Sequence, residues 1–188
     1  MKILVLGANG QVGMCLSDKL FQTNYQTILT SRAQIDITDF EATRKNIFNI
    51  NADVIINAIA YTAVDNAEHD HINANLVNNL AVANIAKICS EMGSTFIHFS
   101  TDYVFDGKAT KPYTESFQTN PNSVYGMTKL MGEQAIQNSK CKYLIFRTGW
   151  VFSEHGNNFF KTMLRLAKDK KELSVVSDQV GSPTYAQD

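Results

Sequence analysis

A tyrosine, a lysine and a polar strand end are the residues of this sequence whose types and spacing best suit chemistry. Tyr125 and Lys129 form a YxxxK pattern, which places a phenol and an ammonium one turn apart on one face of a helix. Ser100, Thr101 and Asp102 follow the apolar run FIHF, so they lie at the end of a predicted strand. All five side chains can exchange protons or hydrogen bonds with a reacting oxygen.

This set of groups suits hydride reduction of a carbonyl. When hydride reaches the carbon, charge develops on the oxygen, which then needs a proton donor and a second hydrogen-bond donor within about 3 Å. A free phenol has a pKa of about 10, and a neighbouring ammonium lowers this pKa by favouring the phenolate. We therefore predict Tyr125 as the acid, Lys129 as its tuner and a ligand of the nicotinamide ribose, and Thr101 as the group that orients the carbonyl.

Three glycines in GANGQVG predict a binding site for the pyrophosphate of a dinucleotide. Gly7, Gly10 and Gly13 directly follow the first predicted strand and open a helix. Glycine permits a tight turn, close approach of backbone N–H groups to phosphate, and close packing of helix on strand, while the helix N-terminus favours negative charge. An ordinary glycine-rich turn is the alternative.

The segment after the second predicted strand bears on the choice of cofactor. Where an NAD-binding fold places an acidic residue on the ribose, about twenty residues after the glycines, the sequence has Ser31 and Arg32. Because an arginine can pair with a 2′-phosphate, NADPH is the predicted cofactor; NADH is the alternative, with Arg32 a solvated loop charge. Asp36 and Ile37 are expected to border the adenine, although Asp36 could instead cap the following helix.

Alternating strands and helices are expected to position these groups. Short apolar runs rich in β-branched residues indicate a parallel sheet buried on both faces, and the stretches between them have helical periodicity. Right-handed crossovers then give an α/β fold, a doubly wound, Rossmann-like parallel sheet with helices on both faces. The expected strands are 2–6, 26–30, 53–57, 95–99, 143–147 and 172–176, and the expected helices are 11–22, 38–49, 74–91, 123–138 and 157–169.

The composition excludes several classes of protein. With 17 basic and 18 acidic residues, the 188-residue chain has no basic face for nucleic acid. No apolar segment is long enough to span a bilayer, so no membrane partner is expected. Cys15, Cys89 and Cys141 are predicted to be buried thiols in a reducing cytoplasm. The run 68–71 lacks a second ligand pair and is predicted to be a solvated loop, so no metal site is expected.

The glycine spacing is similar to that of the extended branch of the short-chain dehydrogenase/reductase superfamily. The whole chain resembles the dTDP-4-dehydrorhamnose reductase family through the ordered motifs GANGQVG, INAIAYTAVDNAE, STDYVFDG, VYGMTKLMGE, IFRTGWVF, NNFFKTMLRLA and DQVGSPTYA. The resemblance implies reduction of the C4 keto group of dTDP-4-dehydro-β-L-rhamnose to dTDP-β-L-rhamnose, a step in making cell-surface polysaccharide. The alternatives are another nucleotide-sugar reductase or epimerase of this branch, and a non-catalytic subunit resembling the β regulatory subunit of methionine adenosyltransferase.

The resemblance also implies roles for individual residues. The cofactor contacts it implies, together with the residues singled out above, are Gly7, Gly10, Gln11, Val12, Gly13, Arg32, Asp36, Ile37, Ala60, Tyr61, Thr62, Tyr125 and Lys129. The implied substrate contacts are Thr101, Asp102 and Trp150. Trp150 could pack on the sugar or belong to the core. Asn78 matches an active-site asparagine of many relatives, or else lies on a helix surface.

The resemblance predicts the domain organisation as well. Residues 1–150 would form the NADP(H)-binding domain with the catalytic residues, and residues 151–188 would hold the last strand-helix elements and the beginning of a smaller C-terminal substrate domain. Members of the family continue into a portion that completes that domain, so we expect a fragment with cofactor affinity and little turnover. A nucleotide sugar is the expected partner, and a homodimer is left open.

Overall fold

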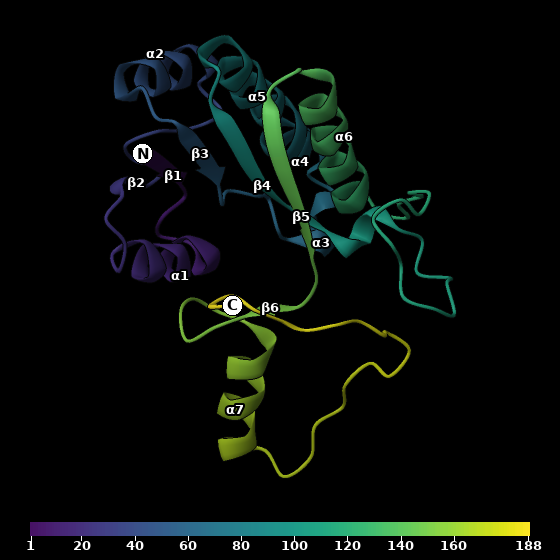
Figure 1. The fold of residues 1–188 in the computed structure, drawn as a ribbon. Helices are drawn as coiled ribbons and strands as arrows, with labels where there is room; N and C mark the ends of the chain where they lie inside the picture. The colour runs from purple at the N-terminus through teal and green to yellow at the C-terminus, as the bar shows by residue number, and fades with distance from the viewer.

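A five-stranded parallel sheet forms the centre of the computed structural model, which describes residues 1–188 (Figure 1). The strands are β1 (Lys2–Leu6), β2 (Gln26–Thr30), β3 (Val54–Asn57), β4 (Thr95–Thr101) and β5 (Lys142–Thr148), in the spatial order β2-β1-β3-β4-β5. The strand order reverses between β1 and β3, which is where doubly wound sheets bind their ligands. The predicted Rossmann-like fold is confirmed.

Helices lie on both faces of this sheet, as the sequence predicted, but they leave much of β5 exposed, including Leu144 and Phe146. Figure 1 shows α1 (Gln11–Leu20) on one face, and α2 (Phe40–Ile50), α5 (Ala81–Met92) and α6 (Val124–Asn138) on the other. The expected helix 74–91 is divided into α4 (His71–Asn75), a π-helical turn η1 (Leu76–Leu80) and α5. Short segments α3 (Val64–Ala67) and η2 (Asp102–Val104) follow β3 and β4.

Two apolar clusters explain why the strands read as continuous apolar runs. Leu4 and Leu6 of β1 point into the main cluster of 16 buried residues, beneath α2 and α5. Ile3 and Val5 point the other way, into a smaller cluster that Leu16 and Leu20 of α1 cover. Successive strand side chains face opposite sides, so a sheet covered on both sides needs apolar residues at every position.

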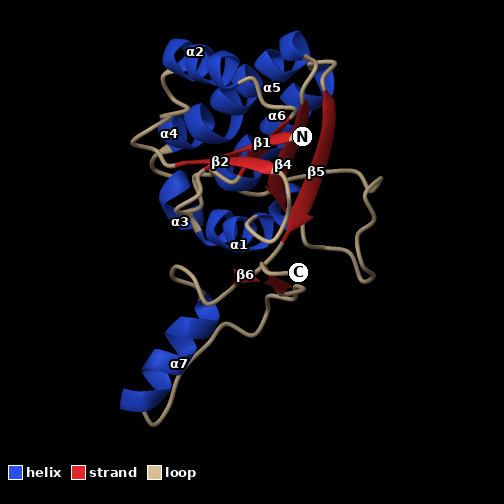
Figure 2. Cartoon of the chain, turned by 60° about the vertical axis from the view of Figure 1, so that its left-hand side comes forward, coloured by secondary structure: helices blue, strands red, loops and turns tan.

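The C-terminal part lies apart from the main sheet (Figures 1 and 2). β6 (Val151–Phe152) pairs with β7 (Thr184–Tyr185), and α7 (Phe159–Asp169) has no buried residue. The predicted strand 172–176 was wrong, because no strand lies beside this segment and Val176 is 66% exposed. Strand propensity reflects a fit to a neighbouring strand and a buried face, and both are missing here.

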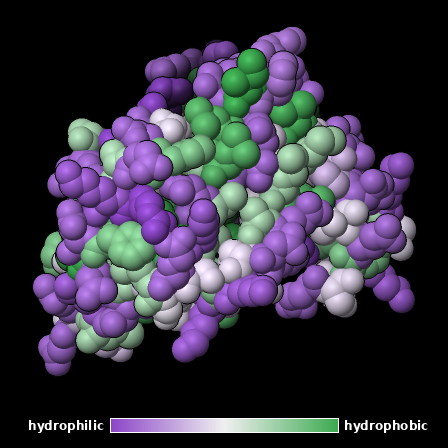
Figure 3. Space-filling model, turned by 90° about the horizontal axis from the view of Figure 1, so that it is seen from above, coloured by the Kyte–Doolittle hydropathy of each residue, from purple (hydrophilic) through white to green (hydrophobic).

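The start of α2 corrects a second prediction. Asp39, not Asp36, caps this helix, since its side chain accepts a hydrogen bond from the Ala42 N–H at 3.0 Å. None of the helices combines the length and the apolar character needed to cross a membrane. The surface is mixed in polarity, and Figure 3 shows apolar side chains gathered in a band among hydrophilic ones on the face seen from above.

Gly132 allows α6 to lie against η1, and its substitution tests this contact. A Cβ added at Gly132 would overlap the backbone oxygen of Asn78. We expect Gly132→Ala to lower the free energy of unfolding by about 1–3 kcal/mol, because the two helices would have to separate. Chemical denaturation measures this change. The control is Gln134→Ala at an exposed site of the same helix, and an equally stable Gly132→Ala protein would contradict the prediction.

Candidate active site

Loops that leave the carboxyl ends of neighbouring strands meet at one edge of the sheet. The glycine loop after β1 lies directly against the loop after β3, since a Cβ on Gly7 would fall 2.6 Å from the Ile59 side chain. Thr101 ends β4 beside them, and the first turns of α6 carry Tyr125 and Lys129. The sheet thus brings together groups that are far apart in the sequence.

The glycine loop has the geometry that a phosphate requires. Gly7 has a φ of 81°, which favours glycine, and a Cβ on Gly13 would overlap the Gly7 carbonyl oxygen. The Gly7 and Ala8 N–H groups both donate to the Thr30 oxygen at 2.9 Å, which fixes the loop on β2. No side chain caps α1 at Gly10, so its positive N-terminus is available to an anion.

A hollow of about 230 Å³ opens next to this loop, lined by Ala8, Asn9, Met14, Ser17, Asp18, Leu29, Ser31 and Gln34. Ligand pockets usually measure about 300–1,000 Å³, so the hollow suits only part of a dinucleotide. The Arg32 side chain is 82% exposed nearby, with its Nε 3.3 Å from Asp36. Hydrogen bonds from Thr38 hold the pKa of Asp36 below its ordinary value. Ile37 is buried in the main core, so its side chain does not border the hollow.

Thr101 and Asp102 are hydrogen-bonded to each other at the end of β4, and Tyr125 lies beside them. The Thr101 hydroxyl donates to the Asp102 carboxylate at 3.2 Å and accepts from the Tyr103 N–H. The same hydroxyl lies close enough to Tyr125 to act on its ionisation. Burial raises the pKa of Asp102, with the bond from Thr101 partly opposing the rise. The structure therefore joins the predicted acid to the predicted carbonyl-orienting group.

Burial and nearby charges act on the ionisation of Tyr125. Burial raises the pKa of the phenol, the hydrogen bond with Thr101 partly offsets this, and the charges of Asp102 and Tyr103 add to the rise. Lys129 is not among the causes of this shift, since its amine bonds to Phe99 and His98. The tuning of the phenol by Lys129 stays a prediction.

The Lys129 side chain is 1% exposed and points into the sheet. Its Nζ donates to the Phe99 backbone oxygen at 2.6 Å and lies 3.2 Å from His98 Nε2. Burial lowers the pKa of Lys129 from 10.5 to about 8, and the charge of Glu133 opposes this shift. The amine is therefore far more easily deprotonated than an exposed lysine.

Asn78 connects the loop after β3 to α6. Its Oδ1 accepts from the Tyr61 N–H at 2.9 Å, while its Nδ2 donates to the Tyr61 oxygen at 3.1 Å and the Thr128 hydroxyl at 3.2 Å. Asn78 is 1% exposed, so the helix-surface interpretation is wrong. Its π-helical turn is a type of irregularity frequent at functional sites. Ala60 and Tyr61 are half-buried in this loop, whereas Thr62 is exposed.

A buried ion pair lies one turn beyond Lys129. Arg147 of β5 donates to Glu133 through Nη2 at 2.7 Å and Nε at 3.0 Å, and the Ser100 hydroxyl donates to the same carboxylate. Glu133 is 1% exposed. The two parallel bonds to the guanidinium hold α6 against the end of β5. The sequence analysis named Ser100 but gave no role to Glu133 or Arg147.

Two residues predicted to bind ligands, Gln11 and Trp150, lie next to the C-terminal segment. Gln11 Nε2 donates to the Val151 oxygen at 3.0 Å, and its Oε1 accepts from Asn158 at 2.8 Å. Trp150 has a φ of 46° and is 49% exposed, which rules out the core-packing alternative. Gln11 therefore joins the glycine loop to the segment that follows Trp150.

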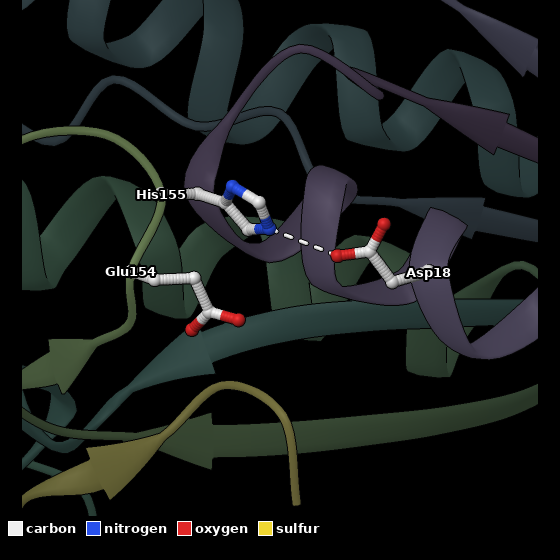
Figure 4. Close-up of side chains that lie close together, drawn as sticks. All are labelled: Asp18, Glu154 and His155. Carbon is white, nitrogen blue, oxygen red and sulfur yellow. Dashed lines mark hydrogen bonds and ion pairs between the residues drawn. The ribbon is translucent and has the colours of Figure 1, made fainter.

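A third link between these parts is shown in Figure 4. His155 Nε2 lies 2.9 Å from the Asp18 carboxylate of α1, and Glu154 is beside them, with all three ligand atoms within 4.8 Å of one another. The sequence analysis did not single out this cluster. The run 68–71 is largely exposed, as predicted, and two of its carboxylates also make contacts: Glu68 accepts from the Val124 N–H at the start of α6 and Asp70 accepts from the Tyr61 hydroxyl.

A comparison with models of known protein families shows which family this chain is related to. Residues 1–188 match the model of the RmlD substrate binding domain. The chain belongs to this family. Curated relatives include the dTDP-4-dehydrorhamnose reductases of Burkholderia thailandensis, 46% identical over 186 residues, and Escherichia coli, 45% identical over 190 residues. The chain spans 62% and 64% of the length of these proteins, and the alignments cover 99% and 100% of the chain.

Solved structures place this RmlD family member among the same relatives. A dTDP-4-dehydrorhamnose reductase from Clostridium acetobutylicum has a TM-score of 0.96 at 43% identity, covering 100% of this chain and 66% of its own. The Bacillus anthracis enzyme in complex with NADP has a TM-score of 0.95 at 38% identity, covering 98% and 66%. A Thermus thermophilus UDP-glucose 4-epimerase shares only the fold, at 18% identity and a TM-score of 0.79 over 89% and 61%.

Because Lys129 is buried, we expect it to lower the free energy of unfolding of this RmlD family member by an amount that depends on pH. Its pKa is about 8 when folded and 10.5 when unfolded, so the unfolded chain binds more protons between these values and stability rises with pH across this window. We expect Lys129→Met to raise the free energy of unfolding by about 1–3 kcal/mol at neutral pH. This advantage over the wild type should shrink as the pH rises through the window.

Urea denaturation of both proteins at a series of pH values measures the difference. The control is Lys87→Met, which makes the same change at an exposed lysine of α5 and should give no such trend. A constant difference between wild type and Lys129→Met across the window would contradict the prediction.

Proposed function

We propose that the protein reduces the C4 keto group of dTDP-4-dehydro-β-L-rhamnose to dTDP-β-L-rhamnose with NADPH, for the synthesis of cell-surface polysaccharide. The observation that carries the proposal is the placement of Thr101, Tyr125 and Lys129 at the carboxyl end of β4, on the sheet edge that also bears the glycine loop. Membership of the RmlD family and the names of the relatives support the substrate. Bacillus subtilis SpsK, a spore coat polysaccharide biosynthesis protein, is 40% identical over 187 residues and supports the biological role.

The residues around the glycine loop fit a dinucleotide. A Cβ would fill the space that Gly7 and Gly13 leave open, and the uncapped start of α1 favours a pyrophosphate. NADPH bound there would supply the hydride. Ala60 and Tyr61 lie in the neighbouring loop, where Asn78 binds the Tyr61 N–H. Lys129 would hold the nicotinamide ribose and assist Tyr125.

The chain's own groups would manage the developing charge. Tyr125, which is protonated at neutral pH and whose pKa burial raises further, would donate its proton to the C4 oxygen. The Thr101 hydroxyl would orient that oxygen as the second hydrogen-bond donor. Asp102 and the half-exposed Trp150 would contact the sugar. We also propose that residues 1–150 form the cofactor domain and that residues 151–188 begin the substrate domain. A reducing cytoplasm is the proposed location, because it suits three free buried thiols.

Removal of the Tyr125 hydroxyl should abolish the reaction. We expect Tyr125→Phe to lower kcat by about 10²–10⁴, because the transition state loses its proton donor, with NADPH affinity retained. The rate is measured as the loss of NADPH absorbance in the presence of dTDP-4-dehydrorhamnose, with the protein that the complete gene encodes. Tyr143→Phe at an exposed site of β5 is the control.

Three outcomes of this assay would contradict the proposal. An unchanged rate in Tyr125→Phe would remove Tyr125 from its role. Turnover of UDP- or GDP-linked keto sugars but not the dTDP-linked one would favour another reductase of the extended branch. NADPH binding without turnover of any of them would favour the non-catalytic alternative.

Arg32 is positioned to favour NADPH over NADH. Its guanidinium lies beside Asp36 near the hollow that adjoins the glycine loop, and it would pair with a 2′-phosphate. We expect Arg32→Gln to weaken NADPH binding about tenfold and to leave NADH binding nearly unchanged. Isothermal titration with both cofactors tests this expectation. Lys45→Gln at an exposed site of α2 is the control, and equal losses for both cofactors would contradict the assignment.

A further inference from the structure

Asn57, His98 and Lys129 form a buried polar line that crosses the sheet behind the reacting groups. Asn57 and His98 are paired in register on β3 and β4, and both are fully buried. Asn57 Nδ2 lies 3.2 Å from His98 Nδ1, and His98 Nε2 lies 3.2 Å from Lys129 Nζ. The proposed reduction uses Lys129 but assigns nothing to the other two residues. A polar line at this depth is costly unless each group is satisfied.

The contacts of Asn57 decide which nitrogen of His98 carries the ring proton. Asn57 Oδ1 accepts from the Ile59 N–H at 3.0 Å, so its NH₂ group must be the end that faces His98. An amide NH₂ only donates, so His98 Nδ1 accepts and has no proton. The neutral imidazole then carries its proton on Nε2, the nitrogen that faces Lys129.

This tautomer acts on the charge of Lys129. An ammonium has only donors, so its hydrogens and the Nε2–H of His98 would oppose each other across 3.2 Å, whereas a neutral amine can accept from that N–H. No carboxylate pairs with Lys129, because Glu133 on its own helix is bound by Arg147 from β5 and Ser100 from β4. The remaining titratable group on this face of α6 is Tyr125, which is itself buried.

We propose that Asn57 and His98 are positioning residues of the reductase site: Asn57 holds the His98 proton on Nε2, which disfavours the charged form of Lys129. His98 thereby sets the pH above which Lys129 ceases to assist Tyr125 and to bind the cofactor ribose. This role rests on the proposed function, because the ribose contact belongs to it. The lowered pKa of Lys129, about 8, agrees with the geometry.

The ring proton can be located without any turnover. ¹⁵N-histidine labelling and long-range ¹H–¹⁵N correlation spectra distinguish protonated from unprotonated ring nitrogens, and the His98→Leu variant assigns the signal among the four histidines. We expect His98 to show a protonated Nε2 and an unprotonated Nδ1 from neutral to mildly alkaline pH. A proton on Nδ1 would overturn the proposal. The wild-type spectrum is recorded without NADPH. Variants of His69, His71 and His155, at half-buried or exposed sites, assign the other three signals, so the assignment of His98 does not depend on the folding of His98→Leu.

A single substitution should reverse the tautomer. Asn57→Asp keeps the acceptor for the Ile59 N–H but puts a carboxylate opposite His98 Nδ1, so the ring proton moves there and Nε2 becomes an acceptor for the ammonium. In the wild type we expect NADPH affinity to fall as the pH rises through about 8. In Asn57→Asp this fall should move to higher pH by about one to three units.

A double substitution separates the tautomer from simple charge. With His98→Leu in place, Asn57→Asp should shift the NADPH-binding profile by less, because no imidazole connects the new carboxylate to Lys129. An undiminished shift, or no shift in the single variant, would overturn the proposal. These readouts use cofactor binding and ring protonation, so they stand apart from turnover; loss of the proposed function would appear instead as the absence of keto-sugar reduction.

Discussion

The burial of Lys129 is the constraint on which the arrangement of this site depends. An amine without a paired carboxylate must have its hydrogen bonds met inside the protein, and here a backbone oxygen and an imidazole of β4 meet them. These contacts require α6 to lie very close to its neighbours. Gly126 and Gly132 make the approach feasible, because a Cβ at either would overlap the backbone oxygen of Tyr103 or Asn78.

The same closeness places Tyr125 beside Thr101 and explains the second polar system in α6. Ser100, Glu133 and Arg147 join β4, α6 and β5 through one buried carboxylate. This carboxylate is bound by the guanidinium and not by Lys129, which it affects only through its charge. The helix thus carries a buried lysine and a buried glutamate one turn apart, each with partners of its own.

The C-terminal segment is tied to the cofactor side of the sheet and not to its core. Gln11 bonds to Val151 and Asn158, and Asp18 contacts His155, so the first helix after the glycine loop carries the links. α7 itself buries nothing against the five-stranded sheet. These contacts join the helix after the phosphate loop directly to the segment that follows Trp150.

The sequence by itself determined the parallel sheet, the succession of strands and helices along the chain, the glycine loop and the Tyr125–Lys129 pair. These features depend on local periodicity and on residues that are close in the chain. Only the tertiary structure decided that Lys129 is buried against His98, that Asn78 clamps the loop after β3, and that Glu133 pairs with Arg147. These contacts join residues that are 14–31 positions apart, across elements whose side chains meet only after packing. An asparagine, a histidine or a glutamate in a sequence carries no mark of its burial, and the expected strand 172–176 failed for the same reason, since pairing needs a neighbour in space.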